Sequence, residues 1–190
     1  MKKVGLLGGT FNPPHMAHLL MANEAYDVLG LDEVRFMPNA IPPHKADPED
    51  ATAEERLHMT ELAIQSIPYF KIELYEIERG GVSYSYDTLK GLTEREPDTE
   101  FYFIIGGDMI DTLDEWYHIK ELTKLVHFVG VLRPGTAGAT KLPIQLIEAP
   151  LIDLSSTMIR DRLREGRTVT FLVPAAVEQY IREEGLYGTR

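Results

Sequence analysis

The stretch "VGLLGGTFNPPHMAHLLMANEA" (residues 4–25) sets the expected fold of this chain. It opens with a short apolar run that ends in glycines, which is typical of a buried strand. After two prolines, an apolar segment over 16–29 predicts a helix that Gly30 would end. His15 and His18 stand at the junction, three positions apart, so a helical first turn would place them on one face. The stretch has neither the lysine of a phosphate loop nor the G-x-G-x-x-G pattern of dinucleotide-binding turns.

The rest of the chain alternates strand and helix signals. We expect strands at 2–8, 33–38, 70–78, 100–108, 126–133 and 143–149. We expect helices after Thr52 (with Glu55 in a capping box), after Ser83 or Ser85, over 155–166 with Ser155 or Ser156 as cap, and over 174–185. Such alternation predicts a Rossmann-like α/β fold with a doubly wound, mainly parallel sheet and helices on both faces. We predict one domain over 1–190, with a helical portion at about 155–190 packed on it.

The predicted strands place three features at their carboxyl ends. Glycines follow the first strand at 8–9 and the fourth at 106–107, and Arg133 ends the fifth. Ligands of such sheets bind beyond the carboxyl ends of the strands. We therefore expect these segments to meet at one edge of the sheet.

Composition excludes several classes of protein. The chain has 190 residues, no cysteine and a formal net charge of −11. Disulfides and thiolate zinc sites are excluded, and a reduced, cytoplasmic location is expected. The acidic balance argues against nucleic-acid binding, and no apolar stretch reaches the length of a membrane span. An anionic ligand would need local positive groups against this background.

The histidine pair has two readings. Near the N-terminal, positive end of the predicted helix, His15 and His18 could donate hydrogen bonds to an anion. Alternatively, one or both merely cap the helix or pack. A zinc site would need further ligands, and the other histidines show no ligand-like spacing; they are His44, His58, His118 and His127. We therefore predict no metal ligation by side chains.

Two motifs carry a family resemblance. "GGTFNPPHMAH" (8–18) resembles the "GGTFDPPHxGH" signature of the bacterial nicotinate mononucleotide adenylyltransferases, members of the H-x-G-H nucleotidyltransferase superfamily. "SSTMIR" (155–160) resembles the second signature of that superfamily. Five further segments follow the order of the family: "IPPHK" (41–45), "SYSYDT" (83–88), "FIIGGDM" (103–109), "EWY" (115–117) and "RPG" (133–135). Asn12 and Ala17 depart from the signature, which has Asp and Gly there.

The resemblance implies adenylyl transfer from ATP to nicotinate mononucleotide, giving deamido-NAD and pyrophosphate. It implies catalytic roles for His15, His18 and Arg160. It implies ATP contacts by Gly8, Gly9, Thr10, Phe11, Asp108, Ser156 and Thr157, and nicotinate mononucleotide contacts by His44, Lys45, Ser85, Trp116, Tyr117 and Arg133. Mg²⁺ would arrive with ATP, held by its phosphates rather than by a carboxylate cage.

The same residues have plainer readings. Ser156, Thr157 and Arg160 also read as a helix start followed by a surface arginine, and Asp108 as the cap of a short helix. Lys45 and Arg133 read as solvated charges and Trp116 as a core or surface aromatic.

Two rival functions stay open from the sequence. One is another adenylyltransferase of the superfamily, such as an enzyme acting on phosphopantetheine, which would lack "SYSYDT" together with "EWY". The other is a non-catalytic nucleotide-binding or sensor module, against which the intact histidines and "SSTMIR" argue. The sequence leaves a homo-oligomer open.

Overall fold

A parallel sheet forms the centre of the molecule. The structure, a computed structural model, describes residues 1–42, 47–150 and 152–190. Within these ranges six strands pair in the order β3-β2-β1-β4-β5-β6, and every pair is parallel. They are β1 (Lys2–Gly9), β2 (Glu33–Pro38), β3 (Phe70–Ile72), β4 (Thr99–Gly106), β5 (His127–Leu132) and β6 (Ile144–Glu148). This is the strand order of the Rossmann fold, so the predicted fold class is confirmed.

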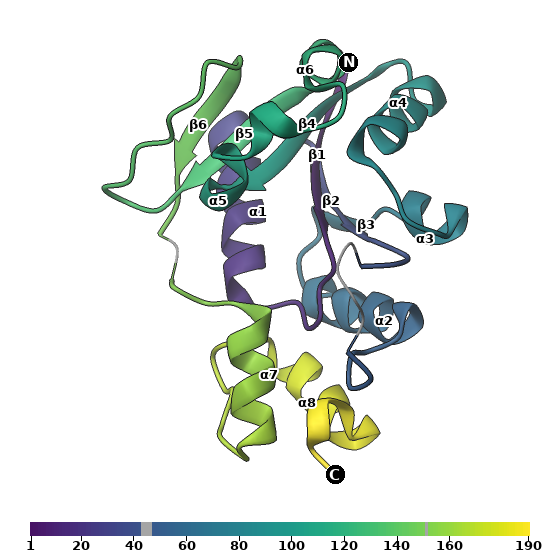
Figure 1. Ribbon diagram of the computed structural model, residues 1–190, viewed down its shortest axis with the longest axis vertical. Coiled ribbons are helices and arrows are strands. Elements are labelled where there is room, and N and C mark those ends of the chain that lie inside the picture. The colour runs from purple at the N-terminus through teal and green to yellow at the C-terminus, as the bar shows by residue number, and fades with distance from the viewer. Residues whose placement is uncertain (43–46, 151) are drawn as a thin grey trace.

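Helices cover both faces of the sheet (Figure 1). They are α1 (Met16–Leu29), α2 (Ala53–Ile64), α3 (Tyr75–Arg79), α4 (Ser85–Arg95), α5 (Gly107–Ile110), α6 (Ile119–Leu125), α7 (Ser156–Arg164) and α8 (Ala175–Glu184), with 3-10 turns η1 (Leu113–Glu115) and η2 (Leu186–Gly188). Successive strand residues point to opposite faces. Leu7 of β1 therefore joins the core under α1 and α2, while Leu6 joins the core under α4 and α6.

Local signals fix the ends of two helices where the sequence predicts them. Gly30 adopts the left-handed conformation (φ 59°) and ends α1, a conformation that costs glycine little. The hydroxyl of Thr52 accepts from the backbone N–H of Glu55, and the Glu55 carboxylate accepts from that of Thr52. This capping box starts α2 as expected.

Three expectations about secondary structure are wrong. The strand expected over 70–78 stops at Ile72, and α3 occupies 75–79. The strand expected over 100–108 ends at Gly106, which caps α5, so Asp108 lies inside that helix and is not its cap. Tyr84, rather than either candidate serine, is the N-cap of α4, and no side chain caps that helix.

The last two helices lie at one end of the sheet, beside α2 (Figure 1). Ile159 of α7 and Val177 and Ile181 of α8 are buried in the same apolar cluster as α1. The C-terminal segment therefore packs directly against the elements that carry the N-terminal motif. Among the described residues, no helix combines the length and the apolar character needed to cross a bilayer.

Candidate active site

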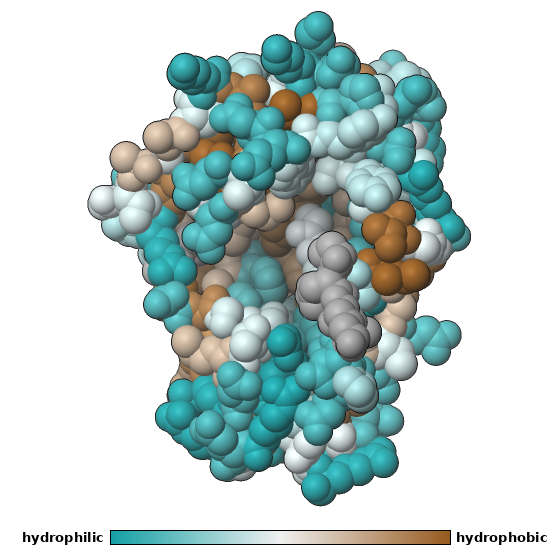
Figure 2. Space-filling view, viewed as in Figure 1, coloured by the Kyte–Doolittle hydropathy of each residue, from teal (hydrophilic) through white to brown (hydrophobic). Residues whose placement is uncertain are grey.

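A cavity of about 730 Å³ opens at the carboxyl edge of the sheet. Figure 2 shows the molecule hollowed on this side, between the part that carries α5 and the part that carries α7. The residues that line it include His15, His18, Gly106, Gly107, Asp108, Asp111, Arg133, Asp153, Ser155 and Ser156. The 106–107 glycines and Arg133 meet here as predicted, whereas Gly8 and Gly9, at the carboxyl end of β1, do not line this cavity. The volume lies within the range of small-molecule sites.

The two histidines form a stacked pair at the wall of this cavity. His15 is the N-cap of α1 and His18 lies in its first turn. Their ring centroids are 3.7 Å apart, and the ring of Phe11 contacts His18 edge-on at 5.0 Å. Burial lowers the pKa of His15 to about 4. Burial, and secondarily His15 itself, lowers the pKa of His18 well below its ordinary value. Both rings are therefore neutral at pH 7.

A single contact determines which nitrogen of His18 carries its proton. The backbone N–H of His15 donates to Nδ1 of His18 at 3.0 Å. Because Nδ1 accepts this bond, the neutral ring holds its proton on Nε2. His18 is thus a hydrogen-bond donor without a permanent charge. The Nδ1 atom of His15 is buried, and no hydrogen bond satisfies it among the described residues.

The start of α7 is tied to the histidine loop. Ser155 is the N-cap, and its hydroxyl accepts from the N–H of Met158 at 3.1 Å. The hydroxyl of Ser156 donates to the carbonyl of Pro13 at 2.9 Å. Arg160 donates to the carbonyl of Asn12 at 2.9 Å and, more weakly, to Thr157 at 3.3 Å. Arg160 is therefore not the free surface arginine of the plainer reading.

Residues that the sequence did not single out hold the other side of this loop. Arg56 is 1% exposed and donates to the carbonyls of Thr10 and Ala40 and to the side chain of Asn39. Tyr187, from the end of the chain, donates its hydroxyl to Asn12. No local pattern marks them, because their partners lie far away in the sequence.

The departure at residue 12 has a structural reason. The Nδ2 atom of Asn12 donates to a carboxylate oxygen of Asp50 at 2.8 Å. An aspartate in the same place has no proton to donate and would face a second negative charge. Asn12 is 3% exposed, so its side chain is committed to the protein rather than to the cavity.

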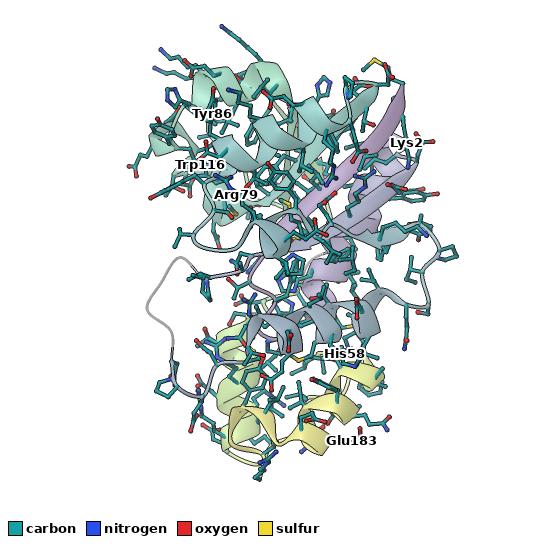
Figure 3. The ribbon with its side chains drawn as sticks, turned by 90° about the vertical axis from the view of Figure 1, so that its right-hand side faces the viewer. Lys2, His58, Arg79, Tyr86, Trp116 and Glu183 are labelled. Carbon is teal, nitrogen blue, oxygen red and sulfur yellow. The ribbon has the colours of Figure 1, made fainter. Side chains whose placement is uncertain are left out.

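A second, smaller pocket lies at the start of α4. It has a volume of about 180 Å³ and is lined by Ser83, Tyr84, Ser85, Tyr86, Trp116 and Tyr117. Figure 3 shows Tyr86 and Trp116 close together, near Arg79. Trp116 also packs edge-on against Phe103 and Phe128 at 6.2 Å, so it serves the core and the pocket together. The hydroxyl of Ser83 is buried there without a partner among the described residues, a feature that the sequence reading missed.

The structure separates some residues that the resemblance grouped. Arg133 lines the large cavity, where it pairs with Asp153 at 3.1 Å, and not the small pocket of Ser85 and Trp116. None of the residues 8–11 lines the cavity, and within this stretch the buried Phe11 packs against His18. His44 and Lys45 lie outside the described residues.

In the ranges that the structure describes, no three His, Asp or Glu residues cluster closely enough to hold an ion.

Comparisons with known proteins agree with this geometry. The cytidylyltransferase-like family matches residues 6–162. A protein of Lactiplantibacillus plantarum named probable nicotinate-nucleotide adenylyltransferase is 54% identical over 98% of this chain and 88% of its own length. A protein of the same name from Bacillus cytotoxicus is 52% identical over 98% of this chain and 99% of its own.

Solved structures show the same fold at low identity. The nicotinic acid mononucleotide adenylyltransferase of Plasmodium falciparum, complexed with NaAD, has a TM-score of 0.84 at 20% identity and covers 100% of this chain and 99% of its own. A putative nicotinate-nucleotide adenylyltransferase from Vibrio parahaemolyticus has a TM-score of 0.72 at 21% identity, covering 98% and 96%. From the sequence relatives, the chain belongs to the nicotinate-nucleotide adenylyltransferase family, within the cytidylyltransferase-like proteins.

Proposed function

We propose that this protein transfers the adenylyl group of ATP to nicotinate mononucleotide, releasing deamido-NAD and pyrophosphate in a step of NAD biosynthesis. The observation that carries the proposal is the neutral, stacked pair His15–His18, both of which line the cavity at the carboxyl edge of the sheet, with Nε2–H of His18 as a donor. The relatives that are about half identical to this chain carry the matching name. A chain without cysteine that acts on such substrates fits the cytoplasm.

The reaction needs positioning and charge stabilisation rather than a general base. An oxygen of the mononucleotide phosphate attacks the α-phosphorus of ATP, and the bond from that phosphorus to the bridging oxygen breaks. The nucleophile is already an anion, so no proton has to be removed from it. In such transfers the protein contributes alignment and donors for developing negative charge. The cavity has a donor of this kind in Nε2–H of His18.

The start of α7 fits the leaving pyrophosphate. The first backbone N–H groups of a helix have no partners within the helix, and they favour anions. Ser155 and Ser156 line the cavity at this start. The Ser156 hydroxyl is occupied by Pro13, so we assign phosphate binding here to backbone N–H groups. Thr157 and Arg160 follow on α7 but do not line the cavity, and we assign the remaining donors of the Arg160 guanidinium to the same phosphates. Asp108, which also lines the cavity, would accept from the ribose hydroxyls of ATP.

Mg²⁺ fits this site only as a companion of ATP. We expect the ion to be held by phosphate oxygens and water, because Mg²⁺ that binds with nucleotide phosphates keeps several of its waters. When bound, Mg²⁺ would neutralise part of the charge on the triphosphate. The carboxylates of Asp108 and Asp111 line the same cavity and would face its water shell.

The small pocket fits the nicotinate ring. Its volume of about 180 Å³ suits one aromatic ring, and Trp116 offers a face for stacking. Ser85 is the first residue of α4, so its backbone N–H is free to donate to a carboxylate. We assign the ring to this pocket, with Tyr117 at its rim. Arg133, which lies in the large cavity, is then a ligand for the phosphate of the mononucleotide or for the phosphates of ATP.

The deciding experiment measures pyrophosphate release with ATP, Mg²⁺ and each of three acceptors. Nicotinate mononucleotide should support turnover, and nicotinamide mononucleotide and phosphopantetheine should support little. Turnover with phosphopantetheine alone would identify a different adenylyltransferase. No release with any acceptor, although ATP binds, would identify a nucleotide sensor. Omitting Mg²⁺ should abolish release.

A further inference from the structure

The loop that carries the histidines has a strained backbone. Phe11 has a positive φ of 51°, which a residue with a bulky side chain rarely adopts. Such a conformation persists only where surrounding contacts hold it. The contacts around Phe11 therefore determine where the following residues, His15 and His18, stand.

Hydrogen bonds from three other segments of the chain meet at the next residue, Asn12. Its Oδ1 atom accepts from the hydroxyl of Tyr187 at 2.6 Å and from the N–H of Ala51 at 3.3 Å. Its Nδ2 atom donates to Asp50 at 2.8 Å, and its carbonyl accepts from Arg160 at 2.9 Å. Asn12 thus contacts three separate segments of the chain, 50–51 and Tyr187 through its side chain and Arg160 through its carbonyl.

The Tyr187 contact is built into the fold rather than incidental. Tyr187 lies in η2, 175 positions from Asn12 in the sequence, and is 1% exposed. It also adopts a positive φ of 54°. The donor of this short hydrogen bond, Tyr187, is therefore strained, and so is Phe11, the residue before its acceptor Asn12. A tyrosine buried this deeply needs a partner for its hydroxyl.

We propose that Tyr187 and Asp50 are positioning residues for the reaction, acting through Asn12 on the backbone that places His15 and His18. The inference rests on the proposed function only where its test measures kcat. It makes the identity of residue 12 dependent on residue 50: an amide at one position requires a carboxylate at the other. It also gives the end of the chain a part in setting the catalytic geometry, although Tyr187 does not line the cavity.

The first test removes one hydroxyl. Tyr187→Phe should lower kcat about tenfold or more with little change in either KM, because displacing a catalytic group by about 1 Å costs up to roughly a hundredfold. Tyr69→Phe is the matched control. The Tyr69 hydroxyl also donates a hydrogen bond of 2.6 Å, to Asn23, and neither residue lines the cavity. Ile181→Val, in the buried core of α8, controls for loss of stability and should leave kcat unchanged at a comparable drop in Tm. Wild-type kcat in Tyr187→Phe, or an equal loss in either control, would overturn the inference.

The second test exchanges the pair. Asn12→Asp should lower kcat by a similar factor, and the double variant Asn12→Asp/Asp50→Asn should recover most of it, because the donor then comes from residue 50. A double variant no better than Asn12→Asp would contradict the role of Asp50.

A third readout does not depend on activity. The ring resonances of His15 and His18 in NMR spectra should move in Tyr187→Phe and stay in place in Tyr69→Phe. Unmoved resonances would refute the inference whatever the enzyme does. If the wild-type chain releases no pyrophosphate while the resonances move, the proposed function fails and the positioning role stands.

Discussion

The backbone N–H of His15 donates to Nδ1 of His18 at 3.0 Å, and the two rings stack with centroids 3.7 Å apart. The first residue of the motif thus sets the tautomer of the second. The three-residue spacing brings side chains of a helix to one face. Here it also lets the N-cap residue, His15, hydrogen-bond to His18 in the first turn of the helix. A donor nitrogen without a permanent charge results, and it suits a site where negative charge develops.

Replacing His18 should affect turnover far more than ATP binding. His18→Ala removes a preorganised donor, and loss of one such donor costs on the order of a hundredfold or more in kcat. Steady-state kinetics, with ATP affinity measured separately by calorimetry, would separate the two effects. His58→Ala is the control, because His58 is exposed on α2 next to Tyr180, at the end of the molecule far from the small pocket (Figure 3). A kcat within about threefold of wild type would reassign His18 to packing, since one donor is expected to contribute far more.

The buried histidines should make the protein less stable in mild acid. The pKa of His15 falls from 6.5 to about 4 on folding, so between these values the unfolded chain binds more protons than the folded one. The free energy of unfolding should therefore decrease as pH falls from 6.5 to 4, by about 3 kcal/mol from this group. Urea unfolding at several pH values measures it.

His15→Gln separates this contribution from the rest of the protein. The variant keeps a neutral polar side chain, so its decrease over this window should be smaller than that of wild type, while His58→Gln should leave the decrease unchanged. Glu96 contributes at lower pH: hydrogen bonds from Arg35 lower its pKa to about 2, so its stabilisation is lost only below pH 4.5. Equal pH slopes in His15→Gln and wild type would show that His15 is not the titrating group.

Local signals predicted the elements whose ends depend on neighbouring residues. Gly30 and the Thr52–Glu55 box act within one turn, and both helices begin or end where the sequence indicated. The alternation of "FKIELYEIE" (70–78) predicted one long strand, and this prediction was wrong because contacts with residues far away in the sequence decide the structure after Ile72. Glu73 is buried and forms ion pairs with Arg35 and Arg95. Its carboxylate also accepts from the N–H of Tyr75 at the start of α3.

The candidate site likewise has a part that the sequence predicted and a part that it did not. Motif spacing was enough to bring His15, His18 and the start of α7 to one cavity. The supports of the loop were not readable, because Arg56 and Tyr187 reach it from 46 and 175 positions away. Nothing near either residue in the sequence identifies a partner for it.

Removing Arg160 should raise the KM for ATP and also lower kcat. A guanidinium grips phosphate oxygens, which gives the KM effect. The contact with the Asn12 carbonyl adds a loss of turnover, because the histidine loop loses one of its fixings. Arg164→Ala on the same helix is the control, since Arg164 pairs with Glu49 and Asp161 and, unlike Arg160, does not donate to the Asn12 carbonyl. Unchanged ATP dependence in Arg160→Ala, with a normal circular dichroism spectrum, would exclude the assignment.

The choice of acceptor should depend on one backbone N–H. Nicotinate carries a carboxylate where nicotinamide carries an amide, and a helix start that only donates favours the carboxylate. Ser85→Pro deletes the donor at the first position of α4, where proline is well tolerated. The preceding Tyr84 already has φ −95° and ψ 139°, which suits a residue before proline.

Ser85→Pro should therefore fold and lose about tenfold or more of its preference for nicotinate mononucleotide, because a hydrogen bond to a charged group contributes roughly 1.5–3 kcal/mol. Ser85→Ala keeps the N–H and should keep the preference. The measurement is kcat/KM for the two mononucleotides, accompanied by quenching of Trp116, the only tryptophan of the chain, as acceptor is added. Equal preference in Ser85→Pro and wild type would place the carboxylate elsewhere. Quenching by nicotinate mononucleotide in the same variant would still show that the ring enters this pocket, so the two signals distinguish a misassigned donor from a misassigned pocket.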